Sequence, residues 1–223
     1  AAVGGASDSG SLKVETGAAI VTGTLGKIAL EAAHDLWVDG TLSATAGSIA
    51  LSLSSGAGSF QDAADLGKRS IWLGDNARLL ATGAVKPEFS TAGLRKGEVL
   101  AGGTVSLDAS KLGYVVTGSG SIVDVSGTSA VFDITNQKVR SNVVNPAMTV
   151  AGNAGSITVA ARQGAFVDGT MKAASGGIGA AAGSFTMKVD GLPNESDVVN
   201  ALAGYPKVGG YELWVAVGGS VLP

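Results

Sequence analysis

The residue types that most often carry out chemistry are scarce in this chain. Histidine occurs once, as His34, and cysteine does not occur. A zinc site or a thiol-based dyad requires several such side chains close together. A Ser-His-Asp triad could be assembled on paper from the abundant serines, but no Gly-x-Ser-x-Gly turn between a strand and a helix supports it. We therefore expect His34 to be a surface or turn residue, and we expect no catalytic residue, no bound metal and no cofactor.

Paired carboxylates are the remaining route to catalysis, because some β-helical proteins are polysaccharide lyases or glycosidases. Asp39 and Asp168 occupy equivalent places in a repeated phrase, Val-Asp-Gly-Thr. We place them about five coils, or ~24 Å, apart, whereas the carboxyl groups of a glycosidase lie about 5 to 9.5 Å apart. Each precedes a glycine, so a turn aspartate that accepts backbone hydrogen bonds is the simpler interpretation. An acidic patch of Asp108, Asp124 and Asp133 would need further converging oxygen ligands to hold calcium.

Aromatic side chains could mark a carbohydrate-binding surface, since exposed tryptophan and tyrosine stack on sugar rings. Trp37, Trp72 and Trp214 each lie in a strand-like run. We interpret them as core or covering residues rather than as sugar platforms. The tyrosines lie beside glycine or proline, and we expect them to be partly exposed: Tyr114, Tyr205 and Tyr211.

A five-residue phrase, Gly-Ser/Thr-apolar-polar-apolar, indicates which elements position these residues. It begins at Gly10, Gly47, Gly103, Gly155 and Gly183, with a looser copy at Gly26. Each copy predicts a turn glycine followed by a half-buried strand. A short unit that returns at similar intervals is typical of a solenoid.

The sequence predicts an all-β fold, a parallel β-helix formed by residues 1–223 as a single unit. The 35 glycines, 45% apolar residues and 5% aromatic residues fit short β-branched strands and tight turns better than a core of large rings. We expect about eight to ten coils and a rod ~40 to 50 Å long. The residues expected to point inward and to stack in rows are Ile28, Leu30, Val38, Leu51, Val105, Leu107, Ile157 and Val159.

Three segments break the regular pattern. The intervals from Gly47 to Gly103 and from Gly103 to Gly155 each fit about two coils with an inserted loop. We place the loop insertions at about residues 84–97 and 133–154, where period-2 alternation is lost. Residues 196–203 follow cap residues and have helical spacing, so they predict one short helix, and residues 212–217 predict a final strand.

Any binding by this segment is expected on the two insertions, because loops on a rigid scaffold are free to carry recognition. The simpler interpretation, which the sequence favours over binding, is that these loops only cover the apolar flank of a coil. The candidate recognition residues combine charged, amide and aromatic groups: Lys86, Glu88, Phe89, Arg95, Lys96, Asn136, Gln137, Lys138 and Arg140.

Charge and hydropathy argue against two classes of partner. The formal net charge is −3 and the pI is about 5.1, without a basic face, so we expect no nucleic acid partner. Mean hydropathy is +0.34, but no run approaches the ~20 apolar residues of a membrane-spanning helix, so we expect no membrane insertion.

The first residues resemble neither a signal peptide nor a gene start, and we expect the chain to be a piece of a longer one.

The middle of the chain resembles a known family. Four phrases carry the resemblance, at residues 71–79 (IWLGDNARL), 97–107 (GEVLAGGTVSL), 113–116 (GYVV) and 121–127 (SIVDVSG). They are similar to phrases in the shafts of filamentous-haemagglutinin-like large exoproteins of Gram-negative bacteria, which are exported by two-partner secretion. No Asn-Pro-Asn-Gly type motif of that family's secretion domain is present, so we expect this piece to come from further along an exoprotein.

The resemblance implies a right-handed parallel β-helix from a virulence-associated adhesin that is secreted, extracellular or tethered to the outer membrane at the cell surface. It implies a structural or adhesive role in cell adhesion, aggregation or biofilm attachment. The implied partners are host-cell or bacterial surface glycans or proteins, together with an outer-membrane transporter that exports the full-length protein.

Two other functions stay open, a carbohydrate-active β-helical enzyme and a non-catalytic glycan-binding module. The enzyme would need three or more charged residues close together in a groove. Only 15% of the residues are charged, and they are spread thinly, which favours the structural or adhesive segment.

Overall fold

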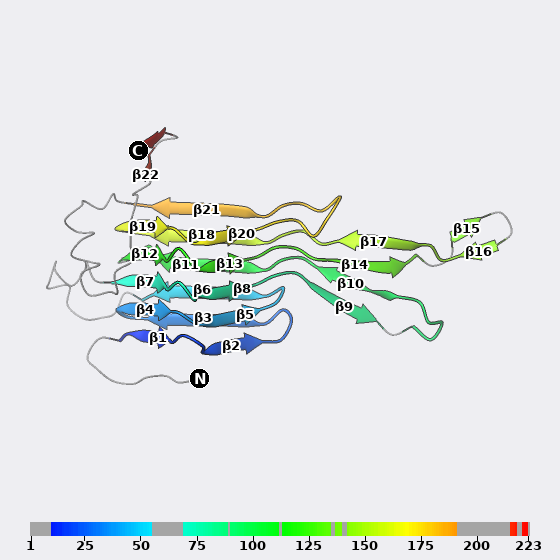
Figure 1. Cartoon of the computed structure of the whole chain (residues 1–223), viewed down its shortest axis with the longest axis horizontal. Helices are drawn as coiled ribbons and strands as arrows, with labels where there is room; N and C mark the ends of the chain where they lie inside the picture. Colours follow the sequence, from blue (N-terminus) through cyan, green and yellow to red (C-terminus); the bar gives the residue numbers. More distant parts are fainter. Residues whose placement is uncertain are drawn as a thin grey trace.

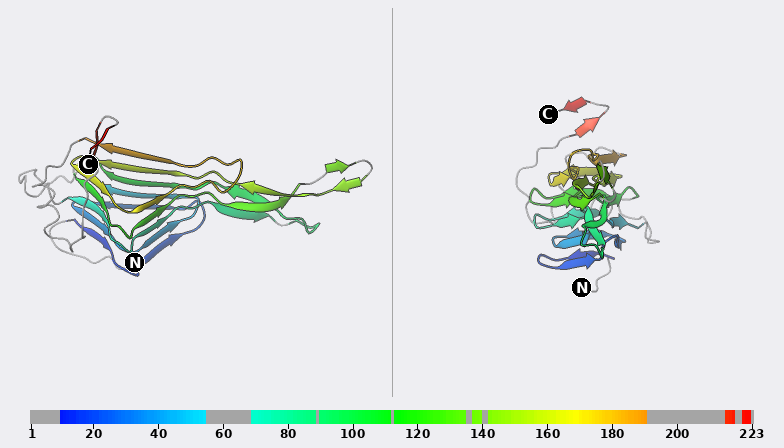
Figure 2. Two further views of the ribbon diagram at one scale, coloured as in Figure 1. Left: turned by 45° about the horizontal axis from the view of Figure 1, so that its top comes forward. Right: turned by 90° about the vertical axis from the view of Figure 1, so that its right-hand side faces the viewer.

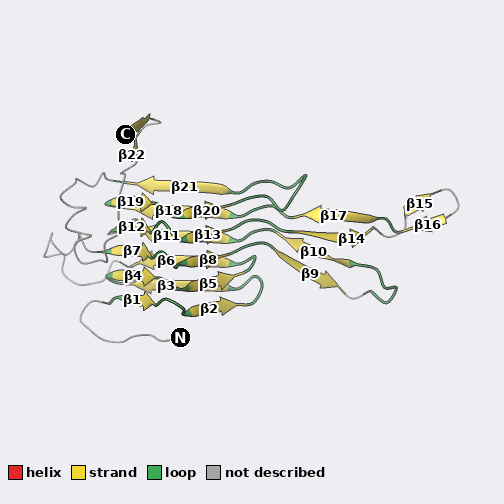
Figure 3. Cartoon of the chain, in the orientation of Figure 1, coloured by secondary structure: helices red, strands yellow, loops and turns green. Residues whose placement is uncertain are grey.

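The computed structural model describes residues 10–54, 69–88, 90–111, 113–134, 137–139, 142–190, 215–217 and 220–222. Every regular element in these ranges is a strand (Figure 3), so they contain no helix that could cross a membrane. The predicted helix at residues 196–203 lies outside the described residues. Of the predicted strand at residues 212–217, only the end is described, as β22 (Val215–Val217), which pairs antiparallel with β23 (Ser220–Leu222).

Most of the strands form three parallel sheets of five strands each. The first sheet has the order β1 (Leu12–Val14), β4 (Asp35–Val38), β7 (Ser70–Leu73), β12 (Tyr114–Thr117) and β19 (Gly164–Val167). The second has the order β2 (Ala19–Thr22), β5 (Thr41–Ala44), β8 (Arg78–Leu80), β13 (Ile122–Asp124) and β20 (Thr170–Lys172). The third has the order β3 (Lys27–Ala32), β6 (Ser48–Leu53), β11 (Thr104–Ala109), β18 (Ser156–Ala161) and β21 (Ser184–Val189).

The chain visits the three sheets in turn and so builds five stacked coils (Figure 1). This all-β parallel solenoid agrees with the predicted architecture. The predicted number of coils was wrong, because β6, β11 and β18 are direct neighbours in the third sheet. Each long interval between pentads therefore holds one coil and an insertion rather than two coils. Five coils span four inter-strand steps, or ~19 Å along the stack.

The core is built from alternating residues of all three sheets. Ile28, Ile49, Val105 and Ile157 are register partners in the third sheet, and each is at most 4% exposed. Alternation places every second side chain inside the coil, so equivalent apolar residues stack in rows. Seven of the eight residues predicted to point inward are buried. The exception is Leu30 in the first coil, which is partly buried against the same core.

The glycines that precede β6, β11, β18 and β21 are required by the close approach of successive coils. A Cβ atom on Gly103 would lie 1.9 Å from the carbonyl oxygen of Gly47, and one on Gly155 would lie 1.7 Å from that of Gly103. Backbone hydrogen bonds cross at the same places, from the Thr104 N–H to Gly47 at 2.9 Å and from the Ser156 N–H to Gly103 at 3.1 Å. No side chain fits between coils held this closely.

An aromatic row lies on the outer face of the first sheet. The rings of Trp37 and Trp72 are stacked, with centroids 5.3 Å apart, and those of Tyr114 and Phe166 lie 6.3 Å apart. Trp72 is 2% exposed, which confirms its interpretation as a covered residue. The expectation that Tyr114 is partly exposed was wrong, because β12 is buried on both faces and Tyr114 is 4% exposed.

The segments predicted as loop insertions contain antiparallel β-hairpins. In the third coil, β9 (Ala84–Glu88) pairs with β10 (Lys96–Leu100). In the fourth, β14 (Ser129–Asp133) pairs with β17 (Ala147–Ala151), and β15 (Gln137–Val139) pairs with β16 (Asn142–Val144) beyond them. The predicted bounds miss the end of β10 and the start of β14. Both hairpins leave the stack between the second and third sheets and project from it in the same direction (Figure 2).

Candidate interaction surface

Asp39, a candidate catalytic carboxylate, holds three coils together at the corner between the first and second sheets. Its carboxylate accepts a hydrogen bond from the Thr16 hydroxyl in the first coil. It also accepts two bonds from Asn76 in the third coil, from the backbone N–H at 3.0 Å and from Nδ2 at 3.2 Å. Partial burial would by itself raise the pKa of Asp39, but these hydrogen bonds outweigh it and hold the pKa below its ordinary value. The residue is an ionised acceptor in a turn.

Asp168 does not join Asp39 in a catalytic pair. Val38, Leu73, Thr117 and Val167 are successive register partners, so the two aspartates lie three coils apart rather than five. Three coil steps correspond to ~14 Å, which exceeds the roughly 5 to 9.5 Å between glycosidase carboxyl groups. The backbone N–H of Asp168 donates to Thr117 Oγ1 at 3.1 Å. This residue therefore also takes part in a hydrogen bond between the turns of neighbouring coils.

The other candidate chemical groups are engaged locally. His34 lies in a bend, and its Nδ1 is 2.9 Å from the Asp35 carboxylate. Asp108 accepts a bond from the Ser110 N–H at 3.0 Å, and Asp124 accepts one from the Ser126 N–H at 2.9 Å. Within the described ranges, no three His, Cys, Asp or Glu residues are grouped so that they could hold a metal ion.

Hairpins β9–β10 and β14–β17 lie side by side and are joined by Arg95 and Asp133; we call the joined hairpins the arm. Arg95 Nη2 is 2.7 Å from Asp133 Oδ1, and the Arg95 N–H donates to Asp133 Oδ2 at 2.7 Å. The Asp133 N–H donates in return to the Arg95 carbonyl at 2.9 Å. The side-chain hydrogen bond from Arg95 holds the pKa of Asp133 below its ordinary value. Because both backbones and both side chains take part, the two hairpins are fixed relative to each other.

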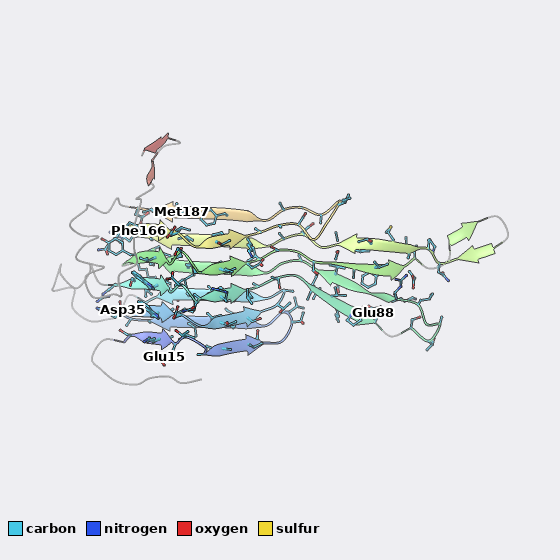
Figure 4. The ribbon with its side chains drawn as sticks, viewed as in Figure 1. Glu15, Asp35, Glu88, Phe166 and Met187 are labelled. Atoms are coloured by element: carbon cyan, nitrogen blue, oxygen red, sulfur yellow. The ribbon has the colours of Figure 1, made fainter. Side chains whose placement is uncertain are left out.

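Opposite charges face one another across the first hairpin. The register places Lys86 opposite Glu98 and Lys96 opposite Glu88. Directly opposed unlike charges in an antiparallel pair stabilise one register over its alternatives. Figure 4 shows Glu88 on β9, well out along the arm and away from the coils. These charges therefore both fix the hairpin and present a mixed polar surface to solvent.

Apolar side chains on the arm are also open to solvent. Val85 on β9 is 41% exposed, Val131 on β14 is 42% exposed and Met148 on β17 is 50% exposed. Core residues of the coils in the third sheet, such as Leu107 and Val159, are fully buried. The arm thus presents half-exposed apolar groups beside facing pairs of opposite charge.

The predicted recognition residues are only partly assembled by the structure. Lys86, Glu88, Arg95 and Lys96 lie on or beside the first hairpin, with Arg95 committed to Asp133. Gln137 and Lys138 belong to β15, and the other three lie outside the described residues: Phe89, Asn136 and Arg140.

Sequence reasoning missed the partner of Arg95 and the exposed apolar residues of the arm. One signal was present, because Lys86-Pro87-Glu88 and Lys96-Gly97-Glu98 repeat the order Lys-x-Glu. Antiparallel pairing of two such segments places unlike charges opposite each other, so this repeat is consistent with a hairpin.

Comparisons of the chain with protein-family models, curated proteins and solved structures gave no match. The function is therefore inferred from the residues of the chain and their arrangement.

Proposed function

We propose that this protein is a structural and adhesive segment of a secreted or surface-exposed bacterial adhesin of the filamentous-haemagglutinin-like kind, and that the arm makes its contacts. The stack of coils is the rigid base, and the arm carries the contact groups away from it (Figure 1). In this proposal the coils are right-handed, as parallel crossover connections almost always are. The sequence phrases at residues 71–79 and 97–107 support the family assignment.

The observation that carries the proposal is the joining of two insertions from consecutive coils. Strand β11 pairs directly with β6 and with β18, so the apolar rows of the coils are continuous and neither hairpin takes part in them. The two hairpins nevertheless leave at one corner and are joined by Arg95 and Asp133. Exposed strands carry a risk of unwanted pairing, so a projecting element of this kind is best explained by a use in binding.

The alternative interpretation, in which the insertions cover the apolar flank of a coil, fits the geometry less well. The hairpins extend away from the coils instead of folding back over them (Figure 2). Val85, Val131 and Met148 are accordingly half-exposed. The partners in this proposal are surface glycans or proteins of a host cell or of another bacterium, and an outer-membrane transporter exports the full-length protein.

Deletion of the arm tests the proposal. We would replace residues 85–99 and residues 130–150 by short glycine-containing turns, singly and together, and measure binding to a glycan array and to whole cells. The shortened proteins should keep a cooperative thermal unfolding transition, because the pairing of β6, β11 and β18 does not involve the hairpins, and they should lose binding. A matched control shortens residues 175–181, the connection between β20 and β21, at the same corner of the fifth coil. Binding that survives removal of both hairpins would contradict the proposal.

A further inference from the structure

Strand β17 is an outer edge of the arm and is open to further pairing. Among the described residues it pairs with β14 alone, and Ala147, Met148 and Thr149 are exposed. Figure 1 shows β17 out on the arm, to the side of the coils. A strand with one unpaired side presents a row of backbone donors and acceptors to any extended chain that can align with it.

The ladder between β14 and β17 shows which backbone groups of β17 face outward. The Ile134 N–H donates to the Pro146 carbonyl at 2.9 Å, and the Gly152 N–H donates to the Thr128 carbonyl at 2.8 Å. Hydrogen-bonded pairs alternate with non-bonded pairs along an antiparallel ladder, so every second residue between these two pairs turns its N–H and carbonyl away from β14. These residues are Ala147, Thr149 and Ala151.

The inner side of β14 agrees with this alternation. The Asp133 N–H is turned away from β17 and donates to the Arg95 carbonyl at 2.9 Å. The corresponding groups of β17 have no backbone partner among the described residues. They therefore remain available to a strand from another molecule.

The opposite outer strand of the arm is protected against edge pairing, whereas β17 is not. Strand β9 contains Pro87 between Lys86 and Glu88, and proline and charged residues are common devices that block pairing at an exposed edge. The residues of β17, Ala147–Ala151, include neither a charge nor a proline. Of the two outer strands, β17 is therefore the one suited to pairing.

The sequence of β17, Ala-Met-Thr-Val-Ala, is nearly the same in both directions around Thr149. Antiparallel pairing of two copies about Thr149 would place Ala147 opposite Ala151 and Met148 opposite Val150, without any like charges in contact. The residues that face outward would then form hydrogen-bonded pairs, each of which exchanges two backbone bonds. Thr149 would lie opposite its own counterpart, and such threonine pairs stabilise sheets.

We propose that two copies of this chain associate through their arms, with β17 of one copy antiparallel to β17 of the other. The contact uses the same surface on both copies, so it joins two copies and does not propagate. Because the paired strands are antiparallel, the two stacks of coils lie at opposite ends of the joined arms. Copies on two facing cells can meet in this way, and many weak contacts add up. This inference rests on the proposed role of the arm as the contact element, and it names a second arm as the partner.

Engineered cysteines test the register. The chain has no cysteine, so Thr149→Cys can cross-link only to a second copy. The two Cα atoms at this position would lie about 5.5 Å apart, within the range of a disulfide. Val131→Cys is the matched control, because Val131 is the register partner of Thr149 on β14 and its two copies would lie ~14 Å apart. Oxidation should give covalent dimers of Thr149→Cys and far fewer of Val131→Cys; equal cross-linking would contradict the register.

Charged substitutions test the association itself. Sedimentation velocity of the full chain over a range of concentrations should show monomers and dimers. Thr149→Lys and Thr149→Glu should each weaken dimerisation about threefold, because like charges then face each other across the contact. Mixing these two variants should restore dimerisation, since the charges are then unlike. Val131→Lys is the control, and it should leave dimerisation unchanged.

Cell binding separates this inference from the proposed function. A chain that is monomeric at every concentration, or charged variants that do not rescue each other, would overturn the inference. If deletion of the arm still removes binding to glycans or whole cells in that case, the proposed function stands. A chain that dimerises through β17 but binds neither glycans nor cells would support the inference and contradict the proposed function.

Discussion

Asp39 shows how a residue type that could perform catalysis is used for structure instead. Its carboxylate accepts hydrogen bonds from the first and third coils while belonging to the second. Thr117 has the equivalent use further along the stack, where its hydroxyl accepts bonds from the N–H groups of Asp168 and Gly169. These side chains replace backbone partners that the turns cannot provide.

Replacing Asp39 by alanine should destabilise the protein by about 1 to 2 kcal/mol, because donors in two neighbouring coils lose a charged acceptor. The free energy of unfolding from urea denaturation measures the effect. Asp168→Ala is the matched control, since this turn aspartate is exposed, and it should change the free energy by less than about 0.5 kcal/mol. Equal stability of the two variants would show that the hydrogen bonds of Asp39 to the first and third coils do not stabilise the protein.

The stabilisation by Asp39 should depend on pH in one direction. The pKa of this carboxyl is lowered in the folded protein, so its contribution is present above the unfolded value of 3.8 and is lost as the pH falls through the folded pKa. The difference in melting temperature between the wild type and Asp39→Asn should therefore be constant near neutrality and shrink below about pH 4. A difference that grows in acid would contradict this assignment.

The strands of the coils show which structural elements their sequence predicts well. Ser156–Ala161 alternates between half-buried and buried residues along its whole length. A turn glycine followed by this alternation is enough to predict both the strand and its inward face. The same pattern recurs in β6 and β11, so the rows of the third sheet follow directly.

Ile157→Asp should destabilise the protein by about 3 to 5 kcal/mol, because it places an unpaired charge in the apolar row of the third sheet. Thr158→Asp, on the outer face of the same strand, is the control and should have a much smaller effect. Thermal denaturation followed by circular dichroism compares them. Similar melting temperatures would mean that Ile157 does not face the core.

The contact between Arg95 and Asp133 should slow amide hydrogen exchange in the two hairpins that it joins. Asp133→Ala removes the acceptor for the Arg95 side chain and backbone N–H, so amide hydrogen exchange should accelerate in β10 and β14 and stay unchanged in β11 and β18. Glu88→Ala leaves this tie intact and should accelerate exchange in these strands much less. Unchanged exchange in β10 and β14 would show that Arg95 and Asp133 do not hold the hairpins together.

The whole stack was harder to predict from sequence than its strands. The interval from Gly103 to Gly155 is long enough for two coils, and only the pairing of β11 with β18 shows that it holds one coil and a hairpin. Spacing along the chain cannot distinguish these cases, because an insertion adds length without changing the register of the coils. The burial of Tyr114 was mispredicted for a related reason. The neighbouring Gly113 indicated a turn and hence exposure, whereas the Tyr114 ring lies near Phe166 of the next coil.

The same reasoning applies to the candidate site. Charged and amide residues indicated where contacts could lie, and Arg95 was among them. The sequence could not show that Arg95 pairs with Asp133, because the two residues come from different coils. Contacts between coils depend on how many residues each insertion contains, which local patterns do not determine.

The direction of the arm also determines how the molecule bears mechanical load. Strands β9 and β10 continue outward from β8 and β11, while the backbone hydrogen bonds of the coils run along the stack (Figure 1). A pull on the arm therefore acts along the strands and shears many of these bonds at once. A pull along the stack separates the coils one after another. The Arg95–Asp133 tie distributes a pull on either hairpin over the third and fourth coils.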